Sequence, residues 1–288
     1  YDIDIVLDLI DNYIDGFHNS YEWGYSIPYF LAGSHSAHVN NISYLSAKAG
    51  IASRDINFLL NRLDPVERKR YDYSLLEKTY LDYQNTHCED DSAIASLQNA
   101  LSGKDILVLL PGHTIKTCQG QIQHFYKEKN PIVISVNLLT DCYPIDFAYF
   151  SNKNRYQYWR NEAAFNKCKK IVTSNVTTRK DDNLFIIDFL RLVKCGWEQL
   201  DNSGVLLLRL LDLMNVNSIS IAGFDGYSHN SENPNYVEKA MEKTRNTLNA
   251  EEANKDIKSM LVDYKNTRKS SCPISFITPS YFETVMDE

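Results

Sequence analysis

Apolar residues from residue 105 onward fall into short, nearly continuous runs separated by segments long enough for helices. The runs span residues 105–110, 131–137, 147–150, 170–174, 184–187, 218–222 and 274–278. Strands that are apolar almost throughout are covered on both faces, which is typical of a parallel sheet with helices on either side. The intervening segments include residues 119–129 and the leucine-rich residues 202–214. We therefore expect an α/β fold, with a Rossmann-like, mostly parallel sheet and helices on both faces, over residues 93–288.

The first part of the chain follows a helical period instead. Its apolar residues recur at three- and four-residue steps, beginning with Ile3, Val6, Leu7, Ile10 and Ile14. A second helix is expected over residues 53–63, where Ser53 has the chemistry of an N-cap. The polar residues 89–92 separate this pattern from the strands. We expect a small helical region over residues 1–92, followed by the α/β domain.

Composition and charge narrow the possible partners and compartment. The formal net charge of −7 argues against a nucleic-acid partner, because the phosphate backbone is bound by a concentrated positive field. No apolar run reaches membrane-spanning length, and acidic residues interrupt the first apolar segment, unlike a signal peptide. The six cysteines occur singly, with no C-x-x-C pair, which favours reduced thiols. We expect a cytoplasmic protein.

Polar residues follow the predicted strands at their carboxyl ends, where parallel sheets bind ligands. Most of them are Ser, Thr or Asn, which bond a sugar or ribose hydroxyl without adding charge. Each residue alone is explained equally well as a cap or a turn, but the set at one sheet edge favours a binding site. The candidate ligand-binding residues are Gly112, Thr114, Asn137, Ser151, Asn152, Asn202, Ser203, Gly204, Gly223 and Asp225.

The loop after the first strand, residues 111–114, occupies the position of a Rossmann phosphate turn. It lacks the G-x-G-x-x-G pattern, and Asn137 stands where a dinucleotide-binding protein has an acidic residue. These features argue against NAD or FAD and favour a mononucleotide or a nucleotide sugar. Residues 202–204 open a helix that could hold an anion, although capping explains Asn202 equally well.

Three residues are candidates for catalysis: His113, His229 and Asp225. Each histidine flanks a predicted ligand loop and could serve as a general base. Asp225 stands between two glycines at a strand end, where it could bind a sugar hydroxyl, hold a metal or stabilise its own turn. His35 and His38 have helical metal-ligand spacing, but a third ligand is missing and Gly33 indicates a loop, so we expect no metal site.

Residues 23–31, His38 and residues 42–45 resemble the segment that follows the barrel in bacterial aldolase-like proteins. These are related to 4-hydroxy-2-oxovalerate aldolase and HMG-CoA lyase, in the pyruvate carboxyltransferase superfamily. The resemblance covers residues 1–84 and implies a lyase whose N-terminal TIM barrel precedes this chain in cis. In that family the catalytic Arg–Asp pair and a metal-binding H-x-H belong to the barrel. Neither occurs here, so no aldolase role is assigned to a residue of this chain.

A second resemblance covers residues 104–280. They are similar to the carboxy-terminal extension of some of these aldolase-like proteins and, more distantly, to bacterial sialyltransferase-like glycosyltransferases. The matching pieces are residues 111–114, Asn137, residues 202–205 and residues 221–227. The resemblance implies that these loops hold a CMP-sugar. The first loop reads Pro-Gly-His rather than a Gly-Asn-Gly-type turn, and the family's catalytic histidine has no secure counterpart.

These features lead to two hypotheses. In the first, the chain is the C-terminal part of an aldolase-like protein of bacterial surface-sugar metabolism, whose α/β domain binds CMP- or another nucleotide-sugar and transfers the sugar. In the second, the same domain is a non-catalytic extension of the barrel that forms a homo-oligomer or docks a partner enzyme. A third, in which the domain processes the barrel's product, is the least favoured because the dinucleotide fingerprint is missing.

Overall fold

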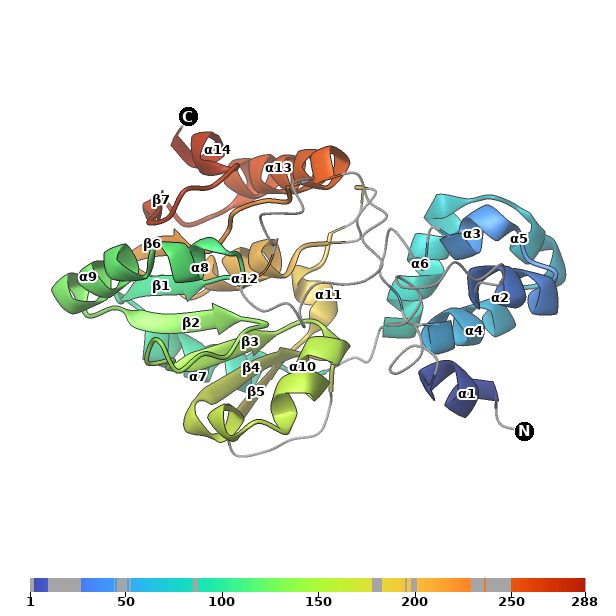
Figure 1. The fold of residues 1–288 in the computed structure, drawn as a ribbon, viewed down its shortest axis with the longest axis horizontal. Helices are drawn as coiled ribbons and strands as arrows, with labels where there is room; N and C mark the ends of the chain where they lie inside the picture. Colours follow the sequence, from blue (N-terminus) through green and yellow to red (C-terminus); the bar gives the residue numbers. More distant parts are fainter. Residues whose placement is uncertain are drawn as a thin grey trace. The chain divides into compact units, whose positions relative to one another are not determined.

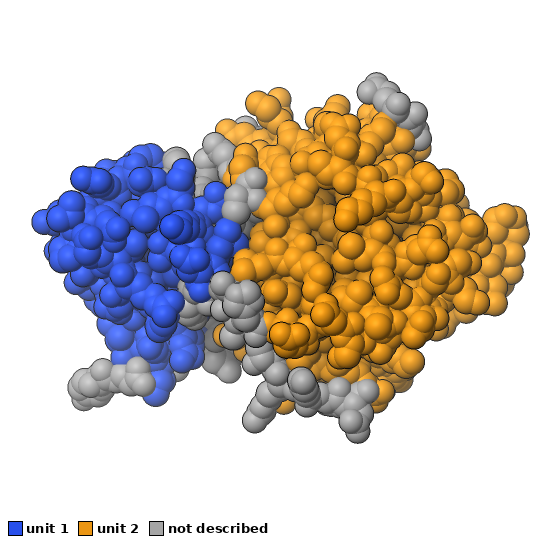
Figure 2. Space-filling model, turned by 180° about the vertical axis from the view of Figure 1, so that it is seen from behind, with its two compact units in different colours: residues 1–83, 198–200, 243–249 blue, residues 84–197, 201–242, 250–288 orange. Residues whose placement is uncertain are grey.

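The computed structural model describes residues 3–9, 27–43, 45, 51, 53–84, 88–177, 183–194, 196–197, 201–228, 236 and 250–287. The chain divides into two compact units, shown in different colours in Figure 2. One is formed chiefly by residues 1–83, and the other by residues 84–197, 201–242 and 250–288. The second unit thus begins at Gln84, nine residues before the predicted start at 93.

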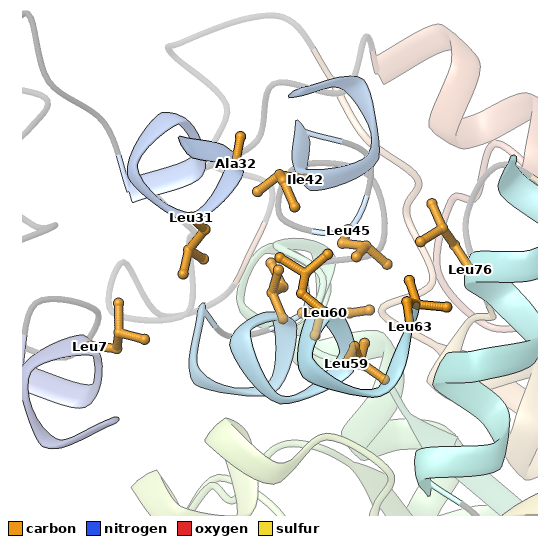
Figure 3. Packing of buried hydrophobic residues seen from close by; sticks show 11 residues of the cluster. Leu7, Leu31, Ala32, Ile42, Leu45, Leu59, Leu60, Leu63 and Leu76 are labelled. Atoms are coloured by element: carbon orange, nitrogen blue, oxygen red, sulfur yellow. The ribbon is translucent and has the colours of Figure 1, made fainter. Parts of the chain in front are cut away.

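The first unit is helical in its described parts. Its helices are α1 (Ile3–Leu9), α2 (Ile27–His35), α3 (Val39–Ser43), α4 (Ser53–Arg62), α5 (Pro65–Lys69) and α6 (Tyr73–Gln84). The apolar face of α4 carries Ile56, Leu59 and Leu60, all buried in a cluster that also contains Leu7 and Leu31 (Figure 3). Helical spacing alone places these α4 positions on one side, so the pattern in the sequence is sufficient to explain this core.

The structure corrects one expectation near His35 and His38 and shows what these histidines contact. Gly33 lies inside α2, so the predicted loop is wrong at this position. The neighbouring His35 is hydrogen-bonded through Nε2 to Asn57 Oδ1 at 2.7 Å. His38 stacks on the ring of Tyr71, with 5.4 Å between ring centroids. Both histidines therefore have contacts within the helical unit.

The second unit is built on a seven-stranded sheet with the order β5-β4-β3-β2-β1-β6-β7, and every strand pair is parallel. The predicted α/β fold with a Rossmann-like sheet is confirmed. The strands are β1 (Asp105–Leu109), β2 (Ile132–Val136), β3 (Phe147–Phe150), β4 (Lys169–Thr173), β5 (Leu184–Ile187), β6 (Ser218–Ala222) and β7 (Ile274–Phe276). Each lies within two residues of a predicted run at both ends.

Helices cover both faces of the sheet (Figure 1). In β1, Leu107 and Leu109 form one buried cluster with Ile115 and Ile122, which lie in α8 (Thr114–Thr117) and α9 (Gln119–Lys129). The helix that follows β3 is α10 (Lys153–Arg160). Since alternate residues of a strand face opposite sides, Ile106 and Val108 face the other layer.

That other layer contains α11 (Phe189–Leu192) and α12 (Ser203–Leu211), which lead back across the sheet from β5 to β6, and α13 (Ala250–Thr267), which follows β6. The helix α12 packs against β2 and α13. The remaining described helices of this unit are α7 (Asp91–Leu101), η4 (Ala163–Lys167) and α14 (Glu283–Asp287). The strand order runs from β1 outward to β5, then returns to β6 on the opposite side of β1. The switch point, where open α/β sheets bind ligands, therefore lies between β1 and β6.

The amino-terminal edge of the sheet is fixed by Asp105. Its Oδ1 accepts hydrogen bonds of 2.6 Å from Asn217 Nδ2 and from Ser218 Oγ, which ties the start of β1 to the start of β6. These bonds lower the pKa of the Asp105 carboxyl below its ordinary value, and the bond from Ser218 makes the largest contribution. Because the pKa of Asp105 is lower in the folded than in the unfolded chain, the ionised carboxylate stabilises the folded state at pH values above the ordinary pKa of aspartate. This stabilisation is lost as the pH falls through the pKa of the folded state.

Asp105→Asn is therefore expected to reduce the acid sensitivity of the α/β unit. Between about pH 5 and about pH 2 the wild-type chain should lose more unfolding free energy than the variant, because the variant has no carboxylate to protonate. Urea unfolding at a series of pH values measures this difference. If the unfolding free energy of the two proteins changed equally with pH over that interval, the lowered pKa of Asp105 would be contradicted.

Candidate functional site

Two loops meet at the switch point, residues 110–114 after β1 and residues 223–227 after β6, and we call them the switch-point loops. Leu110 N donates to Ala222 O at 2.8 Å, and Gly112 N donates to Gly223 O at 3.0 Å. A Cβ atom at Gly112 would overlap the Gly223 carbonyl oxygen and lie 2.6 Å from Asp225 Cγ. Glycine is therefore required at position 112 because the backbone of the other loop fills the space where a side chain would be.

The carboxylate of Asp225 joins the two switch-point loops. Thr114 donates to it twice, from its backbone amide to Oδ2 at 2.8 Å and from its hydroxyl to Oδ1. Thr114 Oγ1 also lies 3.0 Å from Thr278 Oγ1, which in turn accepts from Gly223 N at 3.0 Å. Both Asp225 oxygens thus have partners within the chain. These contacts give Asp225 a structural role between the two loops, whereas the only structural role expected from the sequence was within its own turn.

Burial raises the pKa of the Asp225 carboxyl above its ordinary value. The two hydrogen bonds from Thr114 and the charge of His113 act in the opposite direction but do not cancel the desolvation. His113 therefore lies close to this carboxylate, and its Nδ1 atom is buried without a hydrogen-bond partner among the described residues. These contacts bring the described catalytic candidates, His113 and Asp225, together at the switch point. His229 lies outside the described residues.

A second group of site residues lies beside the switch point, at the ends of β2, β3 and β4 and at the start of α12. We call Asn137, Ser151, Asn175 and Ser203 the polar corner. Asn137 Nδ2 donates to Ser203 Oγ at 2.8 Å, Ser151 Oγ donates to Ser203 Oγ at 2.7 Å, and Asn175 Nδ2 donates to Ser151 O at 3.3 Å. Four segments far apart in the sequence therefore meet in one hydrogen-bonded cluster.

The backbone of Asn137 is fixed on both sides. Its amide donates to Tyr149 O at 2.8 Å, and its carbonyl accepts from the indole nitrogen of Trp159 at 3.1 Å. The residue has a positive φ of 51°, a conformation that asparagine tolerates better than most residues. Asn137 is only 8% exposed, and its side-chain Oδ1 is buried without a partner among the described atoms. Asn175 Oδ1 is in the same situation.

The start of α12 connects the polar corner to the switch-point loops. Asn202 caps the helix, because its Oδ1 accepts from Gly204 N at 2.8 Å and from Val205 N at 3.3 Å. A Cβ atom at Gly204 would lie 2.6 Å from Leu110 Cδ2 and 3.5 Å from the Phe224 ring. The absence of a side chain at position 204 thus allows the helix to approach both loops. The sequence left capping and anion binding as alternatives for the start of this helix, and the side chain of Asn202 caps α12.

A buried ion pair joins Asp201, which lies directly before α12, to Arg209 within that helix. Arg209 Nη1 donates to Asp201 Oδ2 at 2.6 Å, and the two side chains are 9% and 3% exposed. Arg209 also donates to Leu192 O at 2.8 Å, and Asp201 accepts from the amides of Lys194 and Asn202. Burial raises the pKa of Asp201, and Arg209 opposes this shift. The pair therefore fixes the segment from which the Asn202 cap and Ser203 project.

Tyr149 lies in β3, two residues before Ser151, and is fully buried. Desolvation raises the pKa of its hydroxyl far above the ordinary range, with a further contribution from the charge of Asp201. The Tyr149 hydroxyl lies near Ser151, but it is buried without a hydrogen-bond partner among the described residues.

The remaining predicted site residue, Asn152, has a local role. Its side chain accepts from Arg155 N at 3.1 Å and caps α10, so it serves the helix that follows β3. In the described part of the chain, no group of three or more His, Cys, Asp or Glu side chains could hold a metal ion. The cysteines described there are free thiols: Cys88, Cys118, Cys142, Cys168 and Cys272. No described helix is both long and apolar enough to cross a membrane.

From the sequence, Asn175 already belonged to the polar residues 173–175 that follow a predicted strand at the ligand edge, although it was not chosen as a candidate site residue. The sequence alone did not single out Thr278, Asp201 or Tyr149. Thr278 follows β7 at the same edge of the sheet, so the same rule about strand ends would have found it. No sequence signal identifies the other two, because the importance of Asp201 depends on Arg209 eight residues later and that of Tyr149 on its depth.

No protein-family model matches the chain, and no curated protein matches it.

Proposed function

We propose that the α/β unit binds a nucleotide sugar, or a related phosphorylated nucleotide, at the carboxyl edge of its sheet. The observation that carries this proposal is the polar corner. It gathers uncharged hydrogen-bonding side chains from the ends of three adjacent strands and from the start of α12, beside the switch point. Ligands of open α/β sheets occupy this position. Buried amide oxygens without partners are expected where a ligand completes the hydrogen bonding.

Glycosyl transfer is the reaction that the proposal favours, with His113 as the general base because it lies at the switch point near Asp225. The resemblance to sialyltransferase-like enzymes adds support to a CMP-linked sugar. The resemblance of residues 1–84 to aldolase-like proteins supports a place for this unit beside a lyase barrel in surface-sugar metabolism.

Thermal unfolding with nucleotides tests the binding proposal. At a ligand concentration of about one hundred times Kd, binding adds about 2.7 kcal/mol to stability. For a unit of about 200 residues, this corresponds to a rise in Tm of roughly 5 to 10 °C. We expect such a rise with at least one of CMP, CDP, UDP, UDP-glucose and CMP-N-acetylneuraminate.

Asn137→Gly is the matched variant for this experiment, because glycine keeps the positive φ while removing the amide. Asn130→Gly is its control: Asn130 also has a positive φ, of 46°, but it is exposed and follows α9 before β2. The nucleotide-dependent rise should shrink in the first variant and persist in the second. If none of the five compounds raises the Tm of the wild-type chain, the proposed function is wrong.

The alternative function is a non-catalytic extension for self-association or for docking a partner enzyme. The observation in its favour is the contact between Asp225 and Thr114, which uses the one carboxylate among the predicted site residues for a structural link. A chain that forms a stable oligomer in analytical ultracentrifugation, and whose Tm is unchanged by every nucleotide, would support this alternative.

A further inference from the structure

We propose that the polar corner binds the hydroxyl-bearing part of the ligand, its ribose or its sugar, and not its phosphate. This inference rests on the proposed function and specifies which portion of the nucleotide sugar contacts Asn137 and Asn175. Its basis is the balance of hydrogen-bond donors and acceptors that the corner leaves open.

The corner presents two unsatisfied acceptors. Each asparagine amide nitrogen makes one hydrogen bond, to Ser203 Oγ and to Ser151 O respectively, and keeps a second N–H, whereas both Oδ1 atoms are buried without a partner among the described residues. A hydroxyl group both donates and accepts, so it can serve the oxygen and the remaining N–H of such an amide. A buried acceptor without a donor costs roughly 1 to 3 kcal/mol. A hydroxyl group that donates to such an oxygen removes that cost. A phosphate oxygen accepts hydrogen bonds, so placing it against a second acceptor would leave both unsatisfied.

Three backbone donors around the corner are already used. In the first turn of α12, Gly204 N and Val205 N donate to Asn202 Oδ1, and the amide of Asn137 donates to Tyr149 O. In the neighbouring switch-point loops, the amide of Thr114 donates to Asp225. Amides of this kind hold phosphate groups in many nucleotide-binding folds. Because these amides have partners within the chain, phosphate binding at this corner is disfavoured.

The positions of the two free acceptors suit a ring with several hydroxyl groups. Asn137 and Asn175 follow β2 and β4, which lie on either side of β3 and its Ser151. Neighbouring strands are about 4.8 Å apart, so the two asparagines stand roughly 10 Å apart at the backbone, with their side chains directed to the cluster between them. A furanose or pyranose ring above Ser151 would have an acceptor on each side. The fixed backbone of Asn137 orders one of these acceptors before the ligand binds.

Isothermal titration calorimetry with hydroxyl-deleted ligands tests the inference on the whole chain. Wild type, Asn137→Gly and Asn130→Gly are titrated with CMP and UDP, with the 2′-deoxy and 3′-deoxy forms of each, with CMP-N-acetylneuraminate and with inorganic pyrophosphate. If the ribose occupies the corner, deleting one of its hydroxyls weakens binding to the wild-type chain about tenfold, and this difference disappears in Asn137→Gly. If the sugar occupies the corner, Asn137→Gly instead abolishes the difference in affinity between CMP-N-acetylneuraminate and CMP. Pyrophosphate should bind the wild-type chain and Asn137→Gly equally.

Each outcome has a defined meaning. The inference is overturned, while the proposed function stands, if the nucleotides bind but Asn137→Gly leaves both the hydroxyl differences and the sugar difference unchanged. It is also overturned if Asn137→Gly weakens pyrophosphate as strongly as it weakens the nucleotides, since the corner would then bind phosphate. If no nucleotide binds the wild-type chain, the proposed function itself fails. Circular dichroism of each variant shows that it is folded before its titration is interpreted.

Discussion

Replacing Gly223 with alanine is expected to destabilise the α/β unit by about 3 to 5 kcal/mol. Gly223 has a φ of +76°, which disfavours any residue with a side chain, and its Cβ atom would overlap the carbonyl oxygen of Leu110. The same Cβ atom would lie 2.6 Å from Ile115 Cγ1, in the core beneath α8. A backbone oxygen cannot move aside as the end of a flexible side chain can, so the switch-point loops would have to separate.

Gly103→Ala is the matched control for this experiment. Gly103 has a similar φ of +66°, but nothing lies within 4 Å of its Cβ position. Conformational strain alone should cost about 1 to 2 kcal/mol there. Urea unfolding of the two variants therefore separates strain from close approach. Equal losses at the two positions would show that the contact between the loops is not the source of the effect.

Asp201→Ala is expected to cost about 3 to 5 kcal/mol, because it leaves the buried guanidinium of Arg209 without its carboxylate and removes an acceptor from two backbone amides. The exposed ion pair between Lys167 and Asp141, whose side chains are 67% and 82% exposed, supplies the control. Asp141→Ala should change stability by no more than about 0.5 kcal/mol. Chemical unfolding measures both variants.

A double variant, Asp201→Leu with Arg209→Met, shows whether the unpaired charge causes the loss. Apolar replacement of a whole buried ion pair is often close to neutral, so the double variant should recover much of the stability lost in Asp201→Ala. Recovery should be incomplete, because the amides of Lys194 and Asn202 still lack their acceptor. A double variant as unstable as Asp201→Ala would mean that the lost backbone hydrogen bonds dominate.

The two experiments also bear on the site. Gly223 belongs to the switch-point loops and Asp201 lies directly before α12, so their variants report on how the two loops and the start of α12 are positioned. A ligand effect that survives Asp141→Ala but is lost in Asp201→Ala would be attributed to the displaced Asn202 cap and Ser203 rather than to a direct contact.

The strands were readable from the sequence because their signal is local. Buried parallel strands are continuous apolar runs, and the runs at residues 147–150, 184–187 and 218–222 agree with β3, β5 and β6 residue for residue. The helix at residues 119–129 was equally clear. From these elements alone it follows that polar residues after the strands lie at one edge of the sheet.

Only the tertiary structure decided which of those polar residues meet. The strand order places Asn137 beside Ser151 and Asn175, and α12 brings Ser203 onto them, whereas Asn152 turns to its own helix and Asp225 is bonded to Thr114. Hydrophobic patterning carries no information on strand order or on a hydrogen bond across 111 residues, because both depend on packing between distant segments. The sequence thus determined the fold and the edge of the sheet. The three-dimensional arrangement determined the polar corner and its two unpartnered acceptors.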